Sequence, residues 1–215
     1  MIYVNGETEN HRAEVLSDLA NIVKRIENDN KKANERVAVY IDIANIEASL
    51  CDIMDGAAID YPGLVDHLVG ERTLVAAYVF DACRGDDFRQ RRMKKVTSNP
   101  KFRPIMLRYD PNRQEQKGVD MAMGLRMYDE AVRDIYDVAV IVSGDADFIP
   151  AMEFIQRAGK RAEASAFRMS ANGEIECASD AYVPIDDLSV ICLTGTAKHT
   201  EKTTNTIVKR TRVVA

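Results

Sequence analysis

The chain opens with a helical pattern of apolar residues. Over residues 8–35 they recur every three or four positions, the spacing of one helical face. The stripe consists of Val15, Leu16, Leu19, Ile22, Val23 and Ile26. We therefore predict an N-terminal helical extension, residues 1–35, whose apolar face requires a partner surface. The pattern leaves open whether that surface belongs to the same chain or to a second copy in a homo-oligomer.

From Arg36 the pattern alternates between short β-branched runs and helix-like stretches. Strand-like runs start at Arg36 (RVAVYIDIAN) and span Thr73–Phe80, Phe102–Arg108, Asp137–Val142 and Arg161–Ala166. Helix-like stretches span Ile46–Met54, Gly63–Gly70, Phe88–Thr97, Val119–Arg133 and Phe148–Ala158. Such alternation predicts βαβ units, and hence an α/β three-layer sandwich with a mostly parallel central sheet. One domain over residues 36–193 accounts for all of these runs.

Polar residues follow two of the predicted strands. Asp42 and Asn45 come at the end of the first strand, and Asp145 and Asp147 come directly after the buried run VAVIV. In parallel sheets the functional crevice lies outside the carboxyl ends of the strands. Asp120 stands near the start of a predicted helix. If the two strands are neighbours, we expect these groups to converge at one edge of the sheet.

Each aspartate taken alone is typical of a helix cap or a turn. As a set, the carboxylates would repel one another unless a cation offset their charge. Magnesium and manganese prefer oxygen ligands of this kind. The sequence therefore predicts a divalent metal site, with Mg²⁺ or Mn²⁺ bound by Asp42, Asp120, Asp145 and Asp147.

Hydrolysis of a phosphodiester by carboxylate-held metal ions requires no histidine. The chain has three histidines, His11, His67 and His199, and none lies near the aspartates in sequence. This disfavours a histidine-dependent ribonuclease and a Ser-His-Asp hydrolase.

Composition excludes several other classes. Hydrophobic residues make up 46% of the chain and charged residues 29%, which are ordinary globular values, and no apolar run is long enough for a membrane span. The N-terminus lacks the pattern of a secretory signal, so we expect a cytoplasmic protein. The four cysteines form no C-x-x-C pair, which disfavours a zinc knuckle.

Net charge is −5, but positive charge is concentrated locally. The candidate contacts to a nucleic-acid backbone are Arg84, Arg89, Arg91, Arg92, Lys94 and Lys95. A solvated helix face explains such a cluster equally simply. The tail of residues 194–215 is basic and rich in threonine, and its composition favours disorder.

Three ordered motifs carry a family resemblance. The segments YIDIAN, KGVD and VSGDADFIP, with the closing CASDAYVPIDDL, resemble the NYN domain, in particular its LabA-like (DUF88) branch. The resemblance covers about Arg36 to Ile191. It implies a fold of the PIN-like nuclease superfamily, with an acidic pocket that binds Mg²⁺ or Mn²⁺ and cleaves RNA.

The resemblance also implies roles for individual residues. The catalytic and metal-binding positions are Asp42, Asp120, Asp145 and Asp147, and the supporting positions are Asn45, Lys117 and Ser143. One position departs from the pattern, because many members have an aspartate where this chain has Arg126. That arginine either contacts a scissile phosphate or occupies the metal pocket and marks a weakened enzyme.

Three functions fit these observations. The first is a metal-dependent ribonuclease, endonucleolytic and acting on single-stranded RNA. The second is a non-catalytic RNA-binding or regulatory protein on the same fold, as Arg126 would favour. The third is a phosphatase or nucleotide hydrolase with an aspartyl nucleophile, since paired aspartates such as Asp145 and Asp147 also occur in that chemistry.

Overall fold

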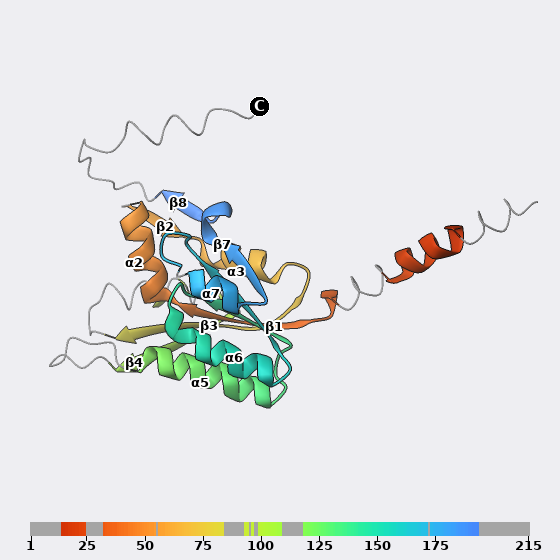
Figure 1. The fold of residues 1–215 in the computed structure, drawn as a ribbon. Coiled ribbons are helices and arrows are strands. Elements are labelled where there is room, and N and C mark those ends of the chain that lie inside the picture. The colour runs from red at the N-terminus through yellow and green to blue at the C-terminus, as the bar shows by residue number, and fades with distance from the viewer. Residues whose placement is uncertain are drawn as a thin grey trace, which may run out of the picture.

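The computed structural model shows one layered α/β domain with a helix standing away from it (Figure 1). It describes residues 14–24, 32–54, 56–83, 93–94, 96, 99–108, 118–171 and 173–193. Residues 14–24 form the separate helix, and the remainder of the helix predicted over residues 8–35 lies mostly outside the described residues. No helix among the described residues is both long and apolar enough to cross a membrane.

A six-stranded sheet forms the centre of the domain. Its strands, in the order in which they lie, are β4 (Phe102–Arg108), β3 (Thr73–Cys83), β1 (Arg36–Asp42), β5 (Val138–Val142), β6 (Arg161–Ala166) and β7 (Ala181–Pro184). All neighbouring strands are parallel. The predicted parallel sheet is thus confirmed. Ile41 of β1 lies beside Val142 of β5, so the two strands that precede the candidate aspartates are neighbours.

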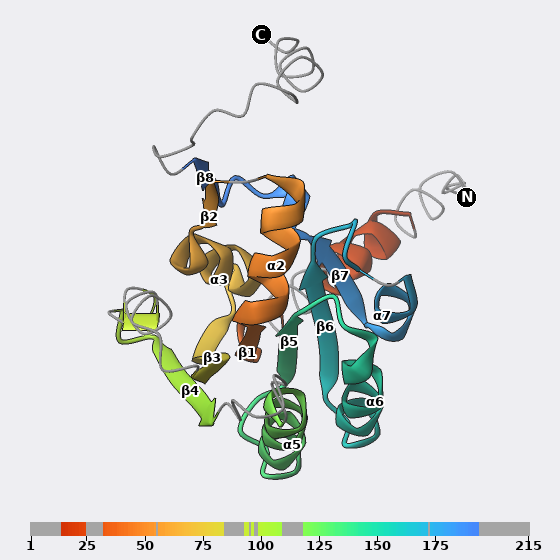
Figure 2. The same ribbon diagram turned by 90° about the vertical axis from the view of Figure 1, so that its left-hand side faces the viewer.

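Helices cover both faces of the sheet (Figure 2). One face carries α2 (Ile43–Ile53) and α3 (Tyr61–Val69). The other carries α5 (Val119–Val132), α6 (Ile149–Arg157) and the short α7 (Gly173–Ala178). The predicted three-layer sandwich is therefore confirmed.

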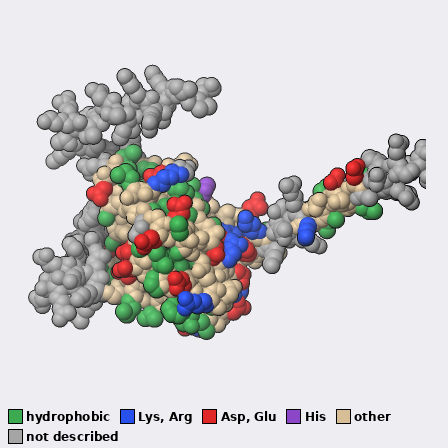
Figure 3. All heavy atoms as spheres, viewed as in Figure 1, with side chains coloured by type: hydrophobic (Ala, Val, Ile, Leu, Met, Phe, Trp, Pro, Cys, Tyr) green, Lys and Arg blue, Asp and Glu red, His purple; other side chains and the backbone are tan. Residues whose placement is uncertain are grey.

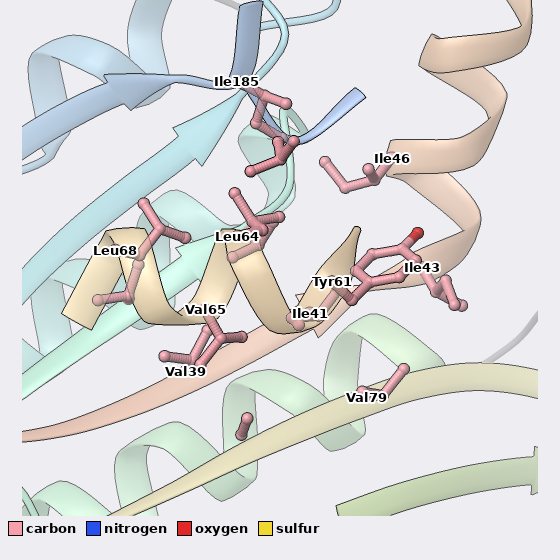
Figure 4. Packing of buried hydrophobic residues seen from close by; sticks show 14 of the residues in the cluster. Val39, Ile41, Ile43, Ile46, Tyr61, Leu64, Val65, Leu68, Val79 and Ile185 are labelled. Atoms are coloured by element: carbon pink, nitrogen blue, oxygen red, sulfur yellow. The ribbon is translucent and has the colours of Figure 1, made fainter. Parts of the chain in front are cut away.

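Strand β1 shows why the chain needs both layers. Val39 and Ile41 point into the core beneath α2 and α3, where they pack with Leu64 and Val65 (Figure 4). Tyr40, between them in sequence, points into the opposite core. A strand covered on both faces has no polar side, which explains its unbroken apolar run.

Several short elements have no counterpart in the predicted pattern. Strands β2 (Ala57–Ile59) and β8 (Ile191–Leu193) form a separate antiparallel pair, and two 3₁₀ turns, η1 (Ala146–Phe148) and η2 (Ile185–Asp187), follow β5 and β7. These elements are only three residues long, too short for a periodic pattern to show. Most of the helix predicted over residues 88–97 and the whole tail of residues 194–215 lie outside the described residues.

Candidate active site

Asp42 ends β1 and begins α2 at the same time. Its Oδ1 accepts the backbone N–H of Asn45 at 3.1 Å and thereby caps α2. Its Oδ2 accepts the hydroxyl of Ser143 at 3.5 Å. The residue is only 6% exposed. Asp42 is therefore a buried carboxylate that is held in place at both oxygens.

A second contact joins the start of α2 to the end of β5. The side-chain oxygen of Asn45 accepts the N–H of Gly144 at 3.0 Å. A Cβ atom on Gly144 would lie 2.7 Å from the carbonyl oxygen of Ser170, so only glycine fits this turn. Asn45 thus fixes the loop that carries the next two aspartates.

The loop after β5 folds onto its own side chains. The N–H of Asp145 donates to the Ser143 hydroxyl at 3.3 Å, and Oδ1 of Asp145 accepts the N–H of Asp147 at 3.0 Å. Asp145 is half-buried, whereas Asp147 is exposed. The sequence GDAD therefore gives a capped turn with two carboxylates of different exposure.

Asp120 approaches from the opposite layer. It lies in the first turn of α5, after Gly118, whose φ of 97° places it in the left-handed region that glycine adopts readily. The side chain is half-buried, and within the described residues its carboxylate accepts no hydrogen bond. Asp120 therefore does not act as a helix cap.

Electrostatics shows that the four carboxylates interact. Burial, with further contributions from the charges of Asp120 and Asp145, raises the pKa of Asp42 to about 6. Burial also raises the pKa of Asp120, and the charges of Asp145 and Asp147 add to this rise. The structure thus brings the four predicted aspartates into one electrostatically coupled cluster at the carboxyl ends of β1 and β5.

The cluster has no basic counterpart in the part of the chain that the structure describes. None of the ion pairs there includes any of the four aspartates. In the same residues, no three carboxylate, imidazole or thiol groups already lie close enough to hold a metal ion together. Lys117, a predicted supporting residue, lies outside the described range. Among the described residues, the cluster is therefore both uncompensated and loosely spaced.

Asp81 is a neighbouring carboxylate that belongs to none of the three family motifs and that we did not predict from the sequence. It lies in the last part of β3, is 1% exposed, and accepts the N–H of Ala82 at 2.8 Å. Burial raises the pKa of Tyr61, and the charges of Asp42 and Asp81 raise it further, so Asp81 lies close to the site. Asp81 directly follows the strand-like run Thr73–Phe80, and the strand-end rule used for Asp42 would have identified it.

Arg126 is bound away from the four aspartates. Its Nη1 donates to Oε1 of Glu130 at 2.9 Å, and its guanidinium lies 4.7 Å from the ring centre of Tyr78. Glu130 is buried and also accepts the hydroxyls of Tyr40 and Tyr78, each at 2.6 Å. Arg126 thus completes a polar network between α5 and the sheet.

Most of the predicted basic cluster lies outside the described residues. Lys94 is exposed, and the other five members, Arg84, Arg89, Arg91, Arg92 and Lys95, lie outside the described residues. Their contact with a nucleic-acid backbone stays a prediction.

Comparison with known proteins places this geometry in a family. Residues 36–186 match the model of the NYN domain. A protein of unknown function from Vibrio parahaemolyticus has a similar crystal structure, with a TM-score of 0.63 and 22% sequence identity over 72% of this chain and 94% of that one. At that identity the likeness concerns the fold alone. No curated protein sequence matches the chain. Since the NYN model spans most of its length, the chain belongs to the NYN domain family, whose fold is that of the PIN-like nucleases.

Proposed function

We propose that this protein is a metal-dependent ribonuclease that cuts single-stranded RNA internally. The observation that carries the proposal is the cluster of Asp42, Asp120 and Asp145, in which burial raises the pKa of Asp42 and of Asp120 and the charge of Asp145 raises both further. Repulsion that no cation among the described residues offsets destabilises a fold, and perturbed carboxylates concentrate at functional sites. Membership of the NYN family, which has nuclease activity, supports the same reading.

The donor set fits a hard divalent cation. Asp42, Asp120, Asp145 and Asp147 would hold Mg²⁺ or Mn²⁺, since both ions prefer carboxylate oxygens and tolerate water in the remaining positions. The ion would also offset the repulsion and bring the loosely spaced carboxylates together. When bound, it supplies Lewis acidity toward the phosphodiester and an activated water.

Hydrogen bonds from neighbouring residues hold the aspartate cluster in place. Ser143 and Asn45 fix Asp42 and the turn after β5 through the hydrogen bonds described above. Asp42 must lose its proton before it can bind a metal, so metal affinity should increase as the pH rises through about 6. In this proposal Lys117 and the basic residues near position 90 contact RNA phosphates.

The position of Arg126 supports catalysis over a purely RNA-binding role. A guanidinium inside the metal pocket would argue for a converted, inactive site. Arg126 is instead bonded to Glu130 and stacked on Tyr78, so it offers no replacement for the metal.

Cleavage of labelled single-stranded RNA tests the proposal. We would compare end-labelled and circular RNA, with Mg²⁺, Mn²⁺ or EDTA, using the wild type, Asp145→Asn and the control Asp66→Asn, which changes an exposed aspartate paired with Lys101. We expect metal-dependent cutting of the circle by the wild type and the control. Asp145→Asn should be at least about 100-fold slower, since even outer-shell partners of metal ligands contribute 10–100-fold.

Two outcomes would contradict the proposal. Retention of RNA by all three proteins without any cutting would make the protein a binder. Cutting that continues in EDTA, or at an undiminished rate in Asp145→Asn, would place the activity elsewhere.

A further inference from the structure

The helix of residues 14–24 has an apolar face that is exposed and that no other part of the described chain covers. Its side chains Val15, Leu16, Leu19, Ile22 and Val23 are between 44% and 67% exposed. They lie on one side of the helix, and the polar residues Ser17 and Asn21 lie on the other. A helix of this length is marginal in water by itself, so it needs a surface to pack on.

The domain has an apolar groove of its own between α5 and α6. The groove is a cavity of about 920 Å³. Met121, Leu125 and Tyr128 line it from α5, at successive turns, and are 71%, 63% and 42% exposed. Phe154 of α6 is 50% exposed and packs edge-to-face on Tyr128, with ring centres 5.6 Å apart. The groove therefore presents a continuous stripe of large apolar side chains to solvent.

The floor of the groove is formed by small residues of α5 and α6. Small residues face each other there, and a Cβ on Gly124 would lie 3.5 Å from the Cβ of Ala151. These small residues let α5 and α6 approach each other closely and leave the floor without large side chains. The stripe continues along α5 to Val132, which is 59% exposed. The 14 residues of α5 span about 21 Å, enough for the roughly 16 Å of the N-terminal helix.

We propose that the helix of residues 14–24 of a second copy of this chain packs into the α5–α6 groove. The two uncovered apolar faces match in length and in helical spacing. The helix stands away from its own domain, whereas apolar side chains also gather over α5 at the lower edge of the domain (Figures 1 and 3). In a two-fold symmetric dimer each chain would place its helix in the groove of the other, so both helices and both grooves would be covered, as a closed dimer requires.

The exchange would have a consequence for the candidate active site. The groove is also lined by Asp120 and Asp147, so the partner's helix would lie beside the aspartate cluster. The docking itself rests on the two apolar faces and does not depend on catalysis.

The test combines light scattering with hydrogen exchange of the full chain over a range of concentrations. Two variants place a charge in the contact, Leu19→Glu on the helix and Leu125→Glu on α5. Two matched controls add the same charge at exposed sites outside it, Asn21→Glu on the polar side of the helix and Met169→Glu, which replaces a side chain that is 85% exposed. All four positions are exposed, so the domain should fold in each variant.

We expect a dimer in which the amides of residues 14–24 become more protected as the chain concentration rises. Leu19→Glu and Leu125→Glu should both be monomeric and lose this protection, and the two controls should behave like the wild type. Protection that does not depend on concentration would mean that the helix packs on its own domain, and would overturn the proposal. A helix whose amides stay unprotected at every concentration would also overturn the proposal. If Leu125→Glu then weakened RNA retention, the groove would instead hold a nucleobase.

Discussion

The two ends of the parallel sheet differ in how their surroundings shift the pKa of carboxylates. At the amino ends of the strands, Asp137 accepts from Arg36 at 2.7 Å and also lies 3.5 Å from Lys160. The hydrogen bonds from Arg36 hold the pKa of Asp137 far below its usual range. At the carboxyl ends, burial and neighbouring aspartates raise the pKa of Asp42 to about 6.

A second amino-end pair strengthens the contrast. Glu163 is buried, and burial alone would raise its pKa, yet Arg72 and Arg161 lower it. Arg72 reaches both carboxylate oxygens of Glu163, at 2.8 and 3.0 Å. The amino end thus uses charge to join strands. The carboxyl end carries charge that, within the described residues, no cation compensates, as the proposed metal site would require.

Breaking the amino-end pair should have the largest effect on stability. Arg72→Met leaves Glu163 with Arg161 alone and removes the bonds from Arg72 to the carbonyls of Leu68 and Val69. We expect a loss of about 2–3 kcal/mol in the free energy of unfolding, since a buried pair broken on one side is costly. Urea denaturation measures it. The double variant Arg72→Met/Glu163→Met should lose less than the single one, and an equal or larger loss would mean that the pair is not what stabilises this end.

Neutralising the carboxyl end should have the opposite sign. The pKa of Asp42 rises from 3.8 to about 6 on folding, so its ionisation destabilises the metal-free protein as the pH rises through that window. Asp42→Asn keeps the helix cap and removes the charge. We expect it to be about 1–2 kcal/mol more stable than the wild type at pH 7 in EDTA.

Unfolding curves from pH 3.5 to about 7 provide the check on this prediction, because the window is set by the raised pKa of Asp42. The gain should disappear below about pH 4, where the wild-type carboxyl is protonated in both states. A gain that is independent of pH would contradict the electrostatic origin.

Arg126 sharpens the comparison, because it lies on the same helix as Asp120 but serves the fold. Arg126→Gln should cost about 1 kcal/mol, since it loses an ion pair and a stacking contact that are partly exposed. Metal-dependent cleavage should remain nearly unchanged. Arg133→Gln, which breaks the exposed pair with Asp129, is the matched control and should cost less than about 0.5 kcal/mol. A large loss of cleavage in Arg126→Gln, at unchanged stability, would return the residue to the active site.

Local pattern predicted the strand ends well. The runs that became β4 and β6 have the same bounds as predicted, and Asp42 and Asp145 could be placed because a strand buried on both faces has a clear apolar signature. Asp81 also follows a predicted strand, but it belongs to none of the three motifs, and in the structure β3 continues past it to Cys83.

Contacts between residues far apart in the chain could not be predicted from the sequence. The hydroxyl of Tyr40 reaches Glu130 across 90 positions, and this network decides where Arg126 points. Strands β2 and β8 are three-residue segments that exist only because they pair with each other. The apolar stripe of residues 14–24 predicted a helix, but its partner depends on how α5 and α6 pack.

The most direct test of the account is whether a divalent metal stabilises the protein through the aspartates at the carboxyl end of the sheet. Urea unfolding with Mn²⁺ or EDTA would be measured for the wild type, Asp120→Asn, Asp145→Asn and the exposed control Asp66→Asn. The account predicts that saturating metal stabilises the wild type and the control by about 2–3 kcal/mol, as for a ligand at about 100 times its Kd, and that both cluster variants lose most of this gain. Equal stabilisation of all four proteins, or none in the wild type, would contradict it.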